Sequence, residues 1–201
     1  MSRGRVALTF DAEHPDRPTR VGVVDTILDT LDRTNVRATF FLQGRWVESN
    51  RETARRIASA GHLVGSHSFY HARMPLLSDD GFRTDVRAAE RAIMRYTGVD
   101  PRPWFRCPFG AGHDQPRTTQ LLSDMGYRDV HWDVTTNDWQ VSQTGTRLAR
   151  ETASEILGLG RDAIVLMHSW PRPTGRGLPD LIQRLAERKV RFVGVDELIG
   201  R

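Results

Sequence analysis

Two histidines four residues apart, His67 and His71, are the residues of this sequence with the clearest chemical potential. Both would lie on one face of a helical turn, where two imidazole rings can bind the same metal ion. A carboxylate from another segment would complete a site of two histidines and one carboxylate, with positions left open for water. Histidines at this spacing also occur on ordinary helices, so the prediction of a catalytic metal site depends on the other polar residues of the chain.

Five polar clusters each follow or end a β-rich run. Taken singly, each has an ordinary explanation: Asp11 could cap a helix, Arg106 could form a surface ion pair, and His168 could be a core histidine. Because the carboxyl ends of parallel strands share one edge of a sheet, we expect all five clusters to meet there and form one site. The clusters are residues 11–14, 67–71, 106–109, 133–139 and 168.

The elements that would position these clusters alternate along the chain. Strands are predicted at residues 6–10, 38–42, 63–67, 104–106, 127–132, 163–168 and 191–195. Helices are predicted at residues 21–31, 49–60, 78–96, 115–125, 144–157 and 179–188, several of them closed by Gly61, Gly98, Gly126 or Gly158. This alternation predicts a single domain over residues 1–201 with a parallel sheet, either closed into a barrel or doubly wound.

The composition excludes several classes of protein. The 201 residues are 38% hydrophobic and 27% charged, which is typical of a globular domain. The 29 basic residues, of which only Lys189 is a lysine, are scattered among acids, so no nucleic-acid partner is expected. No segment approaches eighteen consecutive apolar residues, so no membrane span is expected. Cys107 is the only cysteine and excludes an internal disulfide.

The beginning of the chain bears on its localisation. The first five residues run directly into the predicted strand at 6–10, with no apolar core of a signal peptide. The sequence as written therefore predicts a cytoplasmic protein. A protein of the cell envelope, or a secreted one, is the alternative if a targeting segment has been removed.

The chain resembles the polysaccharide deacetylases of the NodB-like type, the family-four carbohydrate esterases, over nearly its whole length. The resemblance is carried, in the family's order, by residues 8–11 (LTFD), 38–44 (ATFFLQG), 61–71 (GHLVGSHSFYH), 105–110 (FRCPFG), 133–139 (DVTTNDW) and 166–168 (LMH). It implies an α/β fold, an irregular parallel barrel with about seven strands, which agrees with the strands predicted above.

The resemblance also implies a metal cofactor. His67 and His71 would bind a divalent ion, most commonly zinc, with cobalt or a similar ion as the alternative. The commonest first motif of the family has two consecutive aspartates, the second of them a ligand, but here the second position is Ala12. Side chains alternate along a strand, so Glu13 would point the same way as the aspartate two positions earlier. Glu13 is therefore the expected carboxylate ligand, with His14 a weaker candidate.

The remaining roles are likewise implied by the resemblance. Asp11 would be the general base, and Arg106 would pair with it and keep it ionised. His168 would be the general acid that protonates the leaving group, with Asp138 orienting its ring and favouring its protonated form. Substrate contacts would come from the backbone N–H of Phe109 at the oxyanion and from an acetyl pocket formed by Trp139 and Leu166.

The function implied is metal-dependent hydrolysis of N-acetyl groups from an amino-sugar polymer or oligomer, in peptidoglycan or a chitin-like chain. The protein is expected to be a monomer. O-acetyl esters on xylan are an alternative substrate. A second alternative, favoured by the unusual Asp11-Ala12-Glu13 motif, is hydrolysis of a C–N bond in a small amide or ureide. A third alternative is a carbohydrate-binding protein that has lost catalysis; Ala12 is the only feature of the sequence that favours it.

Overall fold

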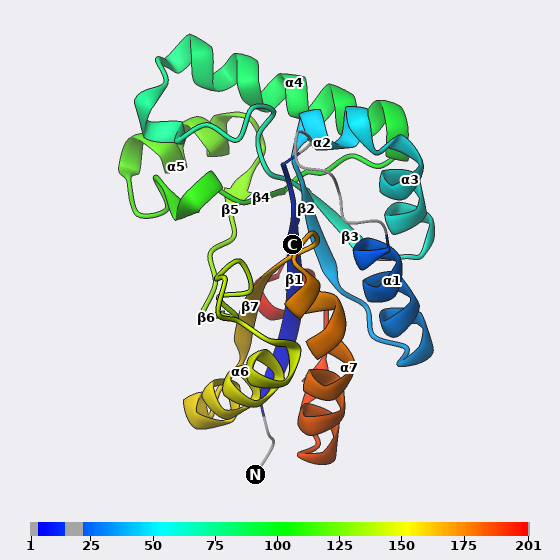
Figure 1. The fold of residues 1–201 in the computed structure, drawn as a ribbon. Helices are drawn as coiled ribbons and strands as arrows, with labels where there is room; N and C mark the ends of the chain where they lie inside the picture. The colour runs from blue at the N-terminus through cyan, green and yellow to red at the C-terminus, as the bar shows by residue number, and fades with distance from the viewer. Residues whose placement is uncertain (1–3, 15–21, 201) are drawn as a thin grey trace. The chain divides into compact units, whose positions relative to one another are not determined.

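The computed structural model of the chain describes residues 4–14 and 22–200, which form two compact units (Figure 1). The first unit comprises Met1–Phe10, Arg17–Thr39 and Trp132–Arg201. The second comprises Asp11–Asp16 and Phe40–His131. Among the described residues, none of the helices combines the length and the apolar composition needed to cross a membrane.

The first unit is built on strand β1 (Arg5–Ala12), whose last two residues belong to the second unit. All but its first residue are buried, as expected of a parallel strand that is covered on both faces. Strand β8 (Arg191–Phe192) pairs with β1, and β6 (Val134–Thr135) pairs with β7 (Ala163–His168), both in parallel. The Thr9 hydroxyl donates a hydrogen bond of 2.7 Å to the Val165 carbonyl and so links β1 to β7.

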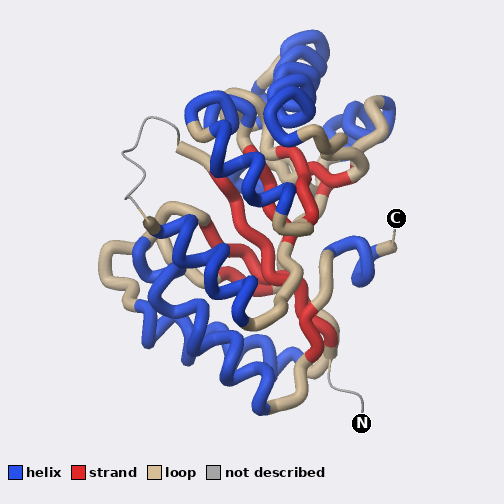
Figure 2. The backbone as a smooth tube through the Cα atoms, turned by 90° about the vertical axis from the view of Figure 1, so that its right-hand side faces the viewer, coloured by secondary structure: helices blue, strands red, loops and turns tan. Residues whose placement is uncertain are grey.

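Two helices of the first unit, α6 (Gly145–Leu159) and α7 (Arg172–Glu187), run side by side (Figures 1 and 2). Glycines allow their close approach, because a Cβ atom on Gly177 would lie 2.5 Å from the carbonyl oxygen of Gly145. Helix α6 begins at a capping residue, Thr144, whose side chain accepts a hydrogen bond from the backbone N–H of Arg147. The other helices of this unit are α1 (Val23–Arg33) and α8 (Val195–Ile199).

The second unit carries β2 (Thr39–Leu42), β3 (Leu63–Ser66), β4 (Trp104–Phe105) and β5 (Arg128–Asp129). In the parallel pairs β3–β4 and β4–β5, Ser66 lies opposite Phe105, which in turn lies opposite Asp129. All three residues are the last of their strands. The segments that follow β3, β4 and β5 therefore emerge together at one edge, where His67 and Arg106 come directly after two of the strands.

Helix α4 (Asp79–Thr97) is the longest of the second unit and packs against α2 (Gly44–Ser49) and α3 (Arg51–Ser59). It begins after Ser78, whose side chain accepts a hydrogen bond from the Gly81 N–H, and it ends at Gly98, whose φ of 75° suits glycine. Helix α5 (Pro116–Asp124) and two 3-10 turns, η1 (Met74–Leu76) and η2 (Pro108–Gly110), complete the unit. One buried apolar cluster of this unit is formed by Met74, Phe82, Val86, Phe105, Cys107, Leu121, Leu122 and Tyr127.

Strand pairing gives one eight-stranded sheet in the order β5-β4-β3-β2-β1-β7-β6, with β8 paired to β1. From β5 to β1, neighbours in the sheet are also neighbours in the chain. This is the order of a singly wound barrel and not of a doubly wound sheet, in which the order reverses. The predicted α/β fold with a parallel sheet of about seven strands is confirmed.

Several predicted elements differ from the structure. The helix predicted at 49–60 corresponds to α3, whereas α2, which lies before it, was not predicted; Asn50, with φ −128° and ψ 45°, separates the two. Helix α7 begins at Arg172 and contains Pro179, the residue at which a helix was predicted to start. Its first two turns are rich in proline and glycine, which is typical of a loop, but one of these glycines, Gly177, permits the contact with α6.

Other differences are smaller. Strand β6 and helix α8, with two and five residues, were not predicted, since elements so short show no periodicity. Helix α6 continues through Gly158 and ends at Gly160, which has a φ of 64°. Val21, predicted to begin the first helix, lies outside the described residues. The prediction of a single domain over residues 1–201 stays a prediction.

Candidate active site

The segment between His67 and His71 is a loop and not the predicted helical turn. Ser68 and His71 have φ values of 60° and 59°, in the left-handed region that few residues other than glycine adopt. The loop brings the two rings together, with their Nε2 atoms 3.2 Å apart and their centroids 4.9 Å apart. The two imidazoles therefore lie close together, although the helical turn that was predicted from their spacing is wrong.

A buried carboxylate on α4, Asp85, explains why this loop is not helical. It accepts hydrogen bonds from the backbone N–H groups of Phe69 and Tyr70 at 2.8 and 3.0 Å, and the Ser68 hydroxyl accepts one from the N–H of His71 at 2.9 Å. Burial raises the pKa of Asp85 above its ordinary value, although the two N–H groups favour the carboxylate. Asp85 was not predicted as a site residue; its only signal in the sequence is an acid on the otherwise apolar face of α4.

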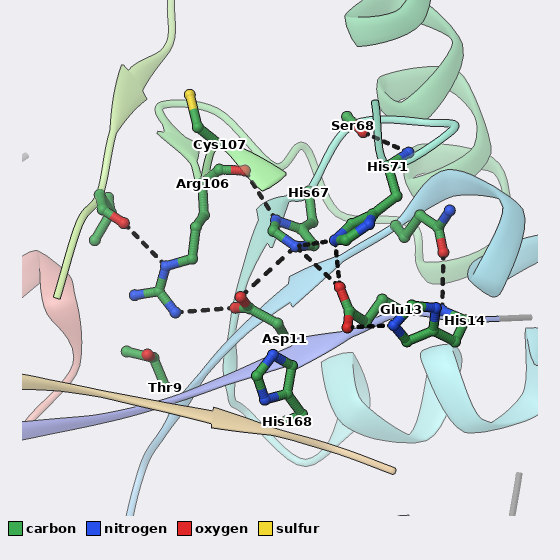
Figure 3. Close-up of polar contacts among 12 residues, drawn as sticks. Thr9, Asp11, Glu13, His14, His67, Ser68, His71, Arg106, Cys107 and His168 are labelled. Carbon is green, nitrogen blue, oxygen red and sulfur yellow. Dashed lines mark hydrogen bonds and ion pairs between the residues drawn. The ribbon is translucent and has the colours of Figure 1, made fainter. Parts of the chain in front are cut away.

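Glu13 joins the two histidines (Figure 3). Its Oε2 atom contacts Nε2 of His71 and lies 3.5 Å from Nε2 of His67. The three side chains each offer a ligand atom, and these atoms all lie within 4.8 Å of one another. We call Glu13, His67 and His71 the metal triad. Two imidazole nitrogens and one carboxylate oxygen, largely shielded from solvent, form a donor set that suits zinc and similar divalent ions.

The charge states of Glu13 and His71 agree with this assignment. Burial alone would raise the pKa of Glu13, but hydrogen bonds from His14, His67 and His71 lower it well below the ordinary range. Burial lowers the pKa of His71, and the neighbouring His67 lowers it further. Glu13 is therefore ionised and His71 neutral near pH 7, which are the forms that bind a metal ion.

The backbone of Arg106 fixes the orientation of the His67 ring. The carbonyl oxygen of Arg106 lies 2.8 Å from Nδ1 of His67, which places a hydrogen on Nδ1 and leaves the Nε2 lone pair directed at the triad. Burial alone would lower the pKa of His67, but the Asp11 and Glu13 carboxylates raise it. His14 lies outside the triad and instead bonds to the carboxylate of Glu13 through Nε2 at 2.8 Å.

The predicted pair of Asp11 and Arg106 is present and buried. The Nη1 atom of Arg106 donates a hydrogen bond to Oδ1 of Asp11 at 2.9 Å, and its Nε atom donates one to the Val130 carbonyl at 2.9 Å. The guanidinium group also lies over the Phe41 ring, 4.1 Å from its centroid. The other oxygen of Asp11, Oδ2, lies 3.6 Å from Nε2 of His67, so this carboxylate borders the triad without belonging to it.

In the first unit, His168 and Asp138 form the second predicted pair. Nδ1 of His168 lies 2.7 Å from Oδ1 of Asp138, and the backbone N–H of His168 donates to Oδ2 at 2.6 Å. The hydroxyl of Thr174 on α7 donates to the same Oδ2 at 2.6 Å. Asp138 and Thr174 are fully buried. Thr174 was not predicted as a site residue, because it lies in a proline- and glycine-rich stretch that is typical of a loop.

The three predicted substrate contacts lie in different environments. Phe109 is 57% exposed and has a φ of 59°, and its ring stands edge-on to His71 at 4.4 Å while the Arg73 guanidinium covers it at 4.6 Å. Trp139 is 44% exposed, with its ring perpendicular to that of His168 at 5.2 Å. Leu166 is buried in β7. Two of the three thus offer exposed aromatic surface beside a predicted catalytic or metal-binding histidine.

Comparison with known proteins settles the family. Residues 1–130 match the family model described as polysaccharide deacetylase. The chain belongs to the polysaccharide deacetylase family. It is 34% identical over 196 residues to the peptidoglycan-N-acetylglucosamine deacetylase PgdA of Listeria monocytogenes, an alignment that covers 98% of this chain and 39% of that protein. The chain thus spans about two-fifths of the length of this relative.

Two further relatives differ in whether they are described as enzymes. The chitin deacetylase of Colletotrichum lindemuthianum is 32% identical over 211 residues, covering 98% of this chain and 80% of the fungal protein. Among solved structures, a family-four carbohydrate esterase pseudoenzyme from Bacillus anthracis superposes with a TM-score of 0.87 at 30% identity, covering 98% of this chain and 66% of that one. The chain is therefore similar both to proteins named as deacetylases and to a relative described as a pseudoenzyme.

Proposed function

We propose that this chain is a metal-dependent deacetylase that removes N-acetyl groups from amino-sugar polymers or oligomers of the peptidoglycan or chitin type. The observation that carries the proposal is the position of Glu13. Its carboxylate completes the metal triad although Ala12 occupies the place of the second aspartate, and Asp11 stays beside the triad as a separate carboxylate. The similarity to peptidoglycan and chitin deacetylases supports the class of substrate.

The triad would hold a divalent ion, with zinc the best match to two imidazoles and one carboxylate. Such an ion supplies Lewis acidity to the acetyl carbonyl and to the attacking water. Asp11 would take the proton from that water as general base. Arg106 occupies Oδ1 of Asp11, so Oδ2, the atom nearer to His67, is the oxygen available to accept the proton.

His168 would return a proton to the leaving amine as general acid. Its Nδ1–H is held by Asp138, so Nε2 is the nitrogen that can donate to substrate. The buried Asp138 carboxylate favours the protonated ring and fixes its orientation, and the Trp139 ring packs edge-on against it. The proton taken by Asp11 and the proton given by His168 balance the hydrolysis of one amide bond.

The first experiment measures acetate release from N-acetylglucosamine oligomers by metal-stripped protein, with and without added zinc or cobalt. We expect release that returns with the metal, and loss of both release and tight metal binding in Glu13→Ala. Glu48→Ala, an exposed glutamate on α2, is the matched control and should behave as wild type. Full activity of Glu13→Ala would refute the role given to this carboxylate.

A second variant separates the base from the ligands. Asp11→Asn should retain metal binding and lose acetate release by roughly 10²- to 10⁴-fold, the usual contribution of a general base. If wild-type protein binds metal but releases no acetate from these oligomers, acetylated xylan and small amides are the next substrates to assay. Binding of oligomers without hydrolysis of any of these substrates would instead support a non-catalytic role, as in the pseudoenzyme relative.

A further inference from the structure

A second group of potential metal ligands lies in the second unit. His113, Asp129 and His131 each offer a ligand atom, and these atoms all lie within 4.8 Å of one another. Asp129 is the last residue of β5, His131 follows two residues later, and His113 follows the turn η2. We call these three residues the β5 cluster. None of them belongs to the metal triad or has a role in the function proposed above.

The carboxylate of Asp129 is the fixed point of the β5 cluster. Its Oδ1 atom accepts a hydrogen bond from the backbone N–H of Cys107 at 2.8 Å, and its Oδ2 atom lies 2.8 Å from Nδ1 of His113. Only 8% of the Asp129 side chain is exposed. The backbone contact therefore holds one oxygen in place and directs the other toward the histidines.

The two histidines of the cluster are stacked. Their ring centroids are 3.9 Å apart and their planes differ by 13°. Burial lowers the pKa of His131, and the neighbouring His113 lowers it further, so this imidazole is neutral near pH 7 and can act as a ligand. Each imidazole ring can offer one in-plane nitrogen lone pair to a cation.

We infer that the β5 cluster is a second binding site for a divalent metal ion of the zinc type, with two imidazole nitrogens and one carboxylate oxygen as ligands. Zinc binds an imidazole nitrogen at about 2.0–2.1 Å. A ligand nitrogen binds its ion in the plane of the ring, and one ion cannot lie in the planes of two stacked rings. One of the two partly exposed rings must therefore turn as the ion binds.

The consequence of such a site is structural. An ion held by the β5 cluster would tie the segment after η2 to the end of β5. It would also neutralise the carboxylate that holds the Cys107 N–H, next to Arg106 in the chain. We therefore expect the second ion to stabilise the fold without being required for metal binding at the triad.

Zinc stoichiometry tests the inference. Metal-stripped protein is equilibrated with zinc chloride, desalted and analysed for bound zinc per chain. Wild type should retain two zinc ions. H113N/H131N should retain one, at the triad, and H71A should retain one, at the β5 cluster. His62→Asn, which changes a histidine outside both groups, should retain two. Asp129 is left intact because its loss would release the Cys107 N–H.

The H71A variant gives a second readout that is independent of activity. Zinc at about 100-fold above its Kd should raise the Tm of H71A by roughly 5–10 °C, and the triple variant H71A/H113N/H131N should show no shift. Equal zinc content in wild type and H113N/H131N would overturn the inference. So would an H71A protein that retains no zinc and melts at the same temperature with and without it.

Discussion

The Nε2 atom of His14 lies 2.8 Å from Oε1 of Glu13, while His71 contacts Oε2 of the same carboxylate (Figure 3). Each oxygen of Glu13 therefore has its own imidazole, and the carboxylate cannot rotate without breaking a contact. His14 is itself held with a φ of 63°, and its backbone N–H donates to the side-chain oxygen of Gln43 at 3.2 Å. Glu13, two residues after Asp11, is thus held in its orientation by His14, the residue that follows it.

Replacing His14 with asparagine should weaken zinc binding at the metal triad by roughly 10- to 100-fold, the usual effect of removing a hydrogen bond to a ligand. Asparagine tolerates the positive φ of this position but is too short to reach Glu13. Zinc titrations in the H113N/H131N background, where only the triad is measured, give the dissociation constant. His62→Asn serves as control, and a wild-type constant for His14→Asn would show that Glu13 needs no such support.

Asp85 offers a prediction about the loop that carries both histidines of the triad. Asp85→Asn replaces one acceptor oxygen with an NH₂ group, so either Phe69 or Tyr70 loses its backbone hydrogen bond. A buried N–H without an acceptor costs about 1–3 kcal/mol, and the loop should shift. Urea unfolding should show this loss of stability, and zinc affinity at the triad should fall with it. Asp80→Asn, exposed on the same helix, should change neither quantity.

The strand ends that carry the polar clusters could be predicted because they depend on two strong signals, buried apolar runs and the polar residues that follow them. The residues that meet in the triad come from two such ends, after β1 and after β3. Glu13 could be chosen over Ala12 because only a carboxylate can bind a metal ion through its side chain. Period-two alternation then gave the correct side.

The supporting residues could not be predicted, because their roles depend on contacts that are distant in sequence. Asp85 is 16 residues beyond Phe69, and Thr174 is 36 beyond Asp138; neither has a local pattern that marks it. The left-handed Ser68 and His71 likewise follow from the contacts of the loop with α4 and not from any glycine. The predicted localisation and monomeric state stay predictions.

Thr174 is predicted to act through Asp138. Thr174→Val removes one of three hydrogen bonds that hold this buried carboxylate, at a cost of about 1–2 kcal/mol. As a result, kcat for deacetylation should fall roughly 5- to 30-fold, with KM little changed. Thr174→Ser keeps the hydroxyl and should restore kcat. A uniform loss in both variants would indicate a packing role instead.

The metal-free protein should lose stability in acid because of Glu13. Its pKa in the folded chain is lowered from 4.5, so the unfolded chain binds this proton more tightly than the folded chain does. Stability from this group is therefore fully present above pH 4.5 and decreases as the pH falls below that value. Urea unfolding in the presence of a chelator, repeated across this range, should show the decrease in wild type and in Glu48→Gln. Glu13→Gln should be less stable near pH 7 and should show a flatter dependence below pH 4.5; a slope equal to that of wild type would mean that other carboxylates govern acid unfolding.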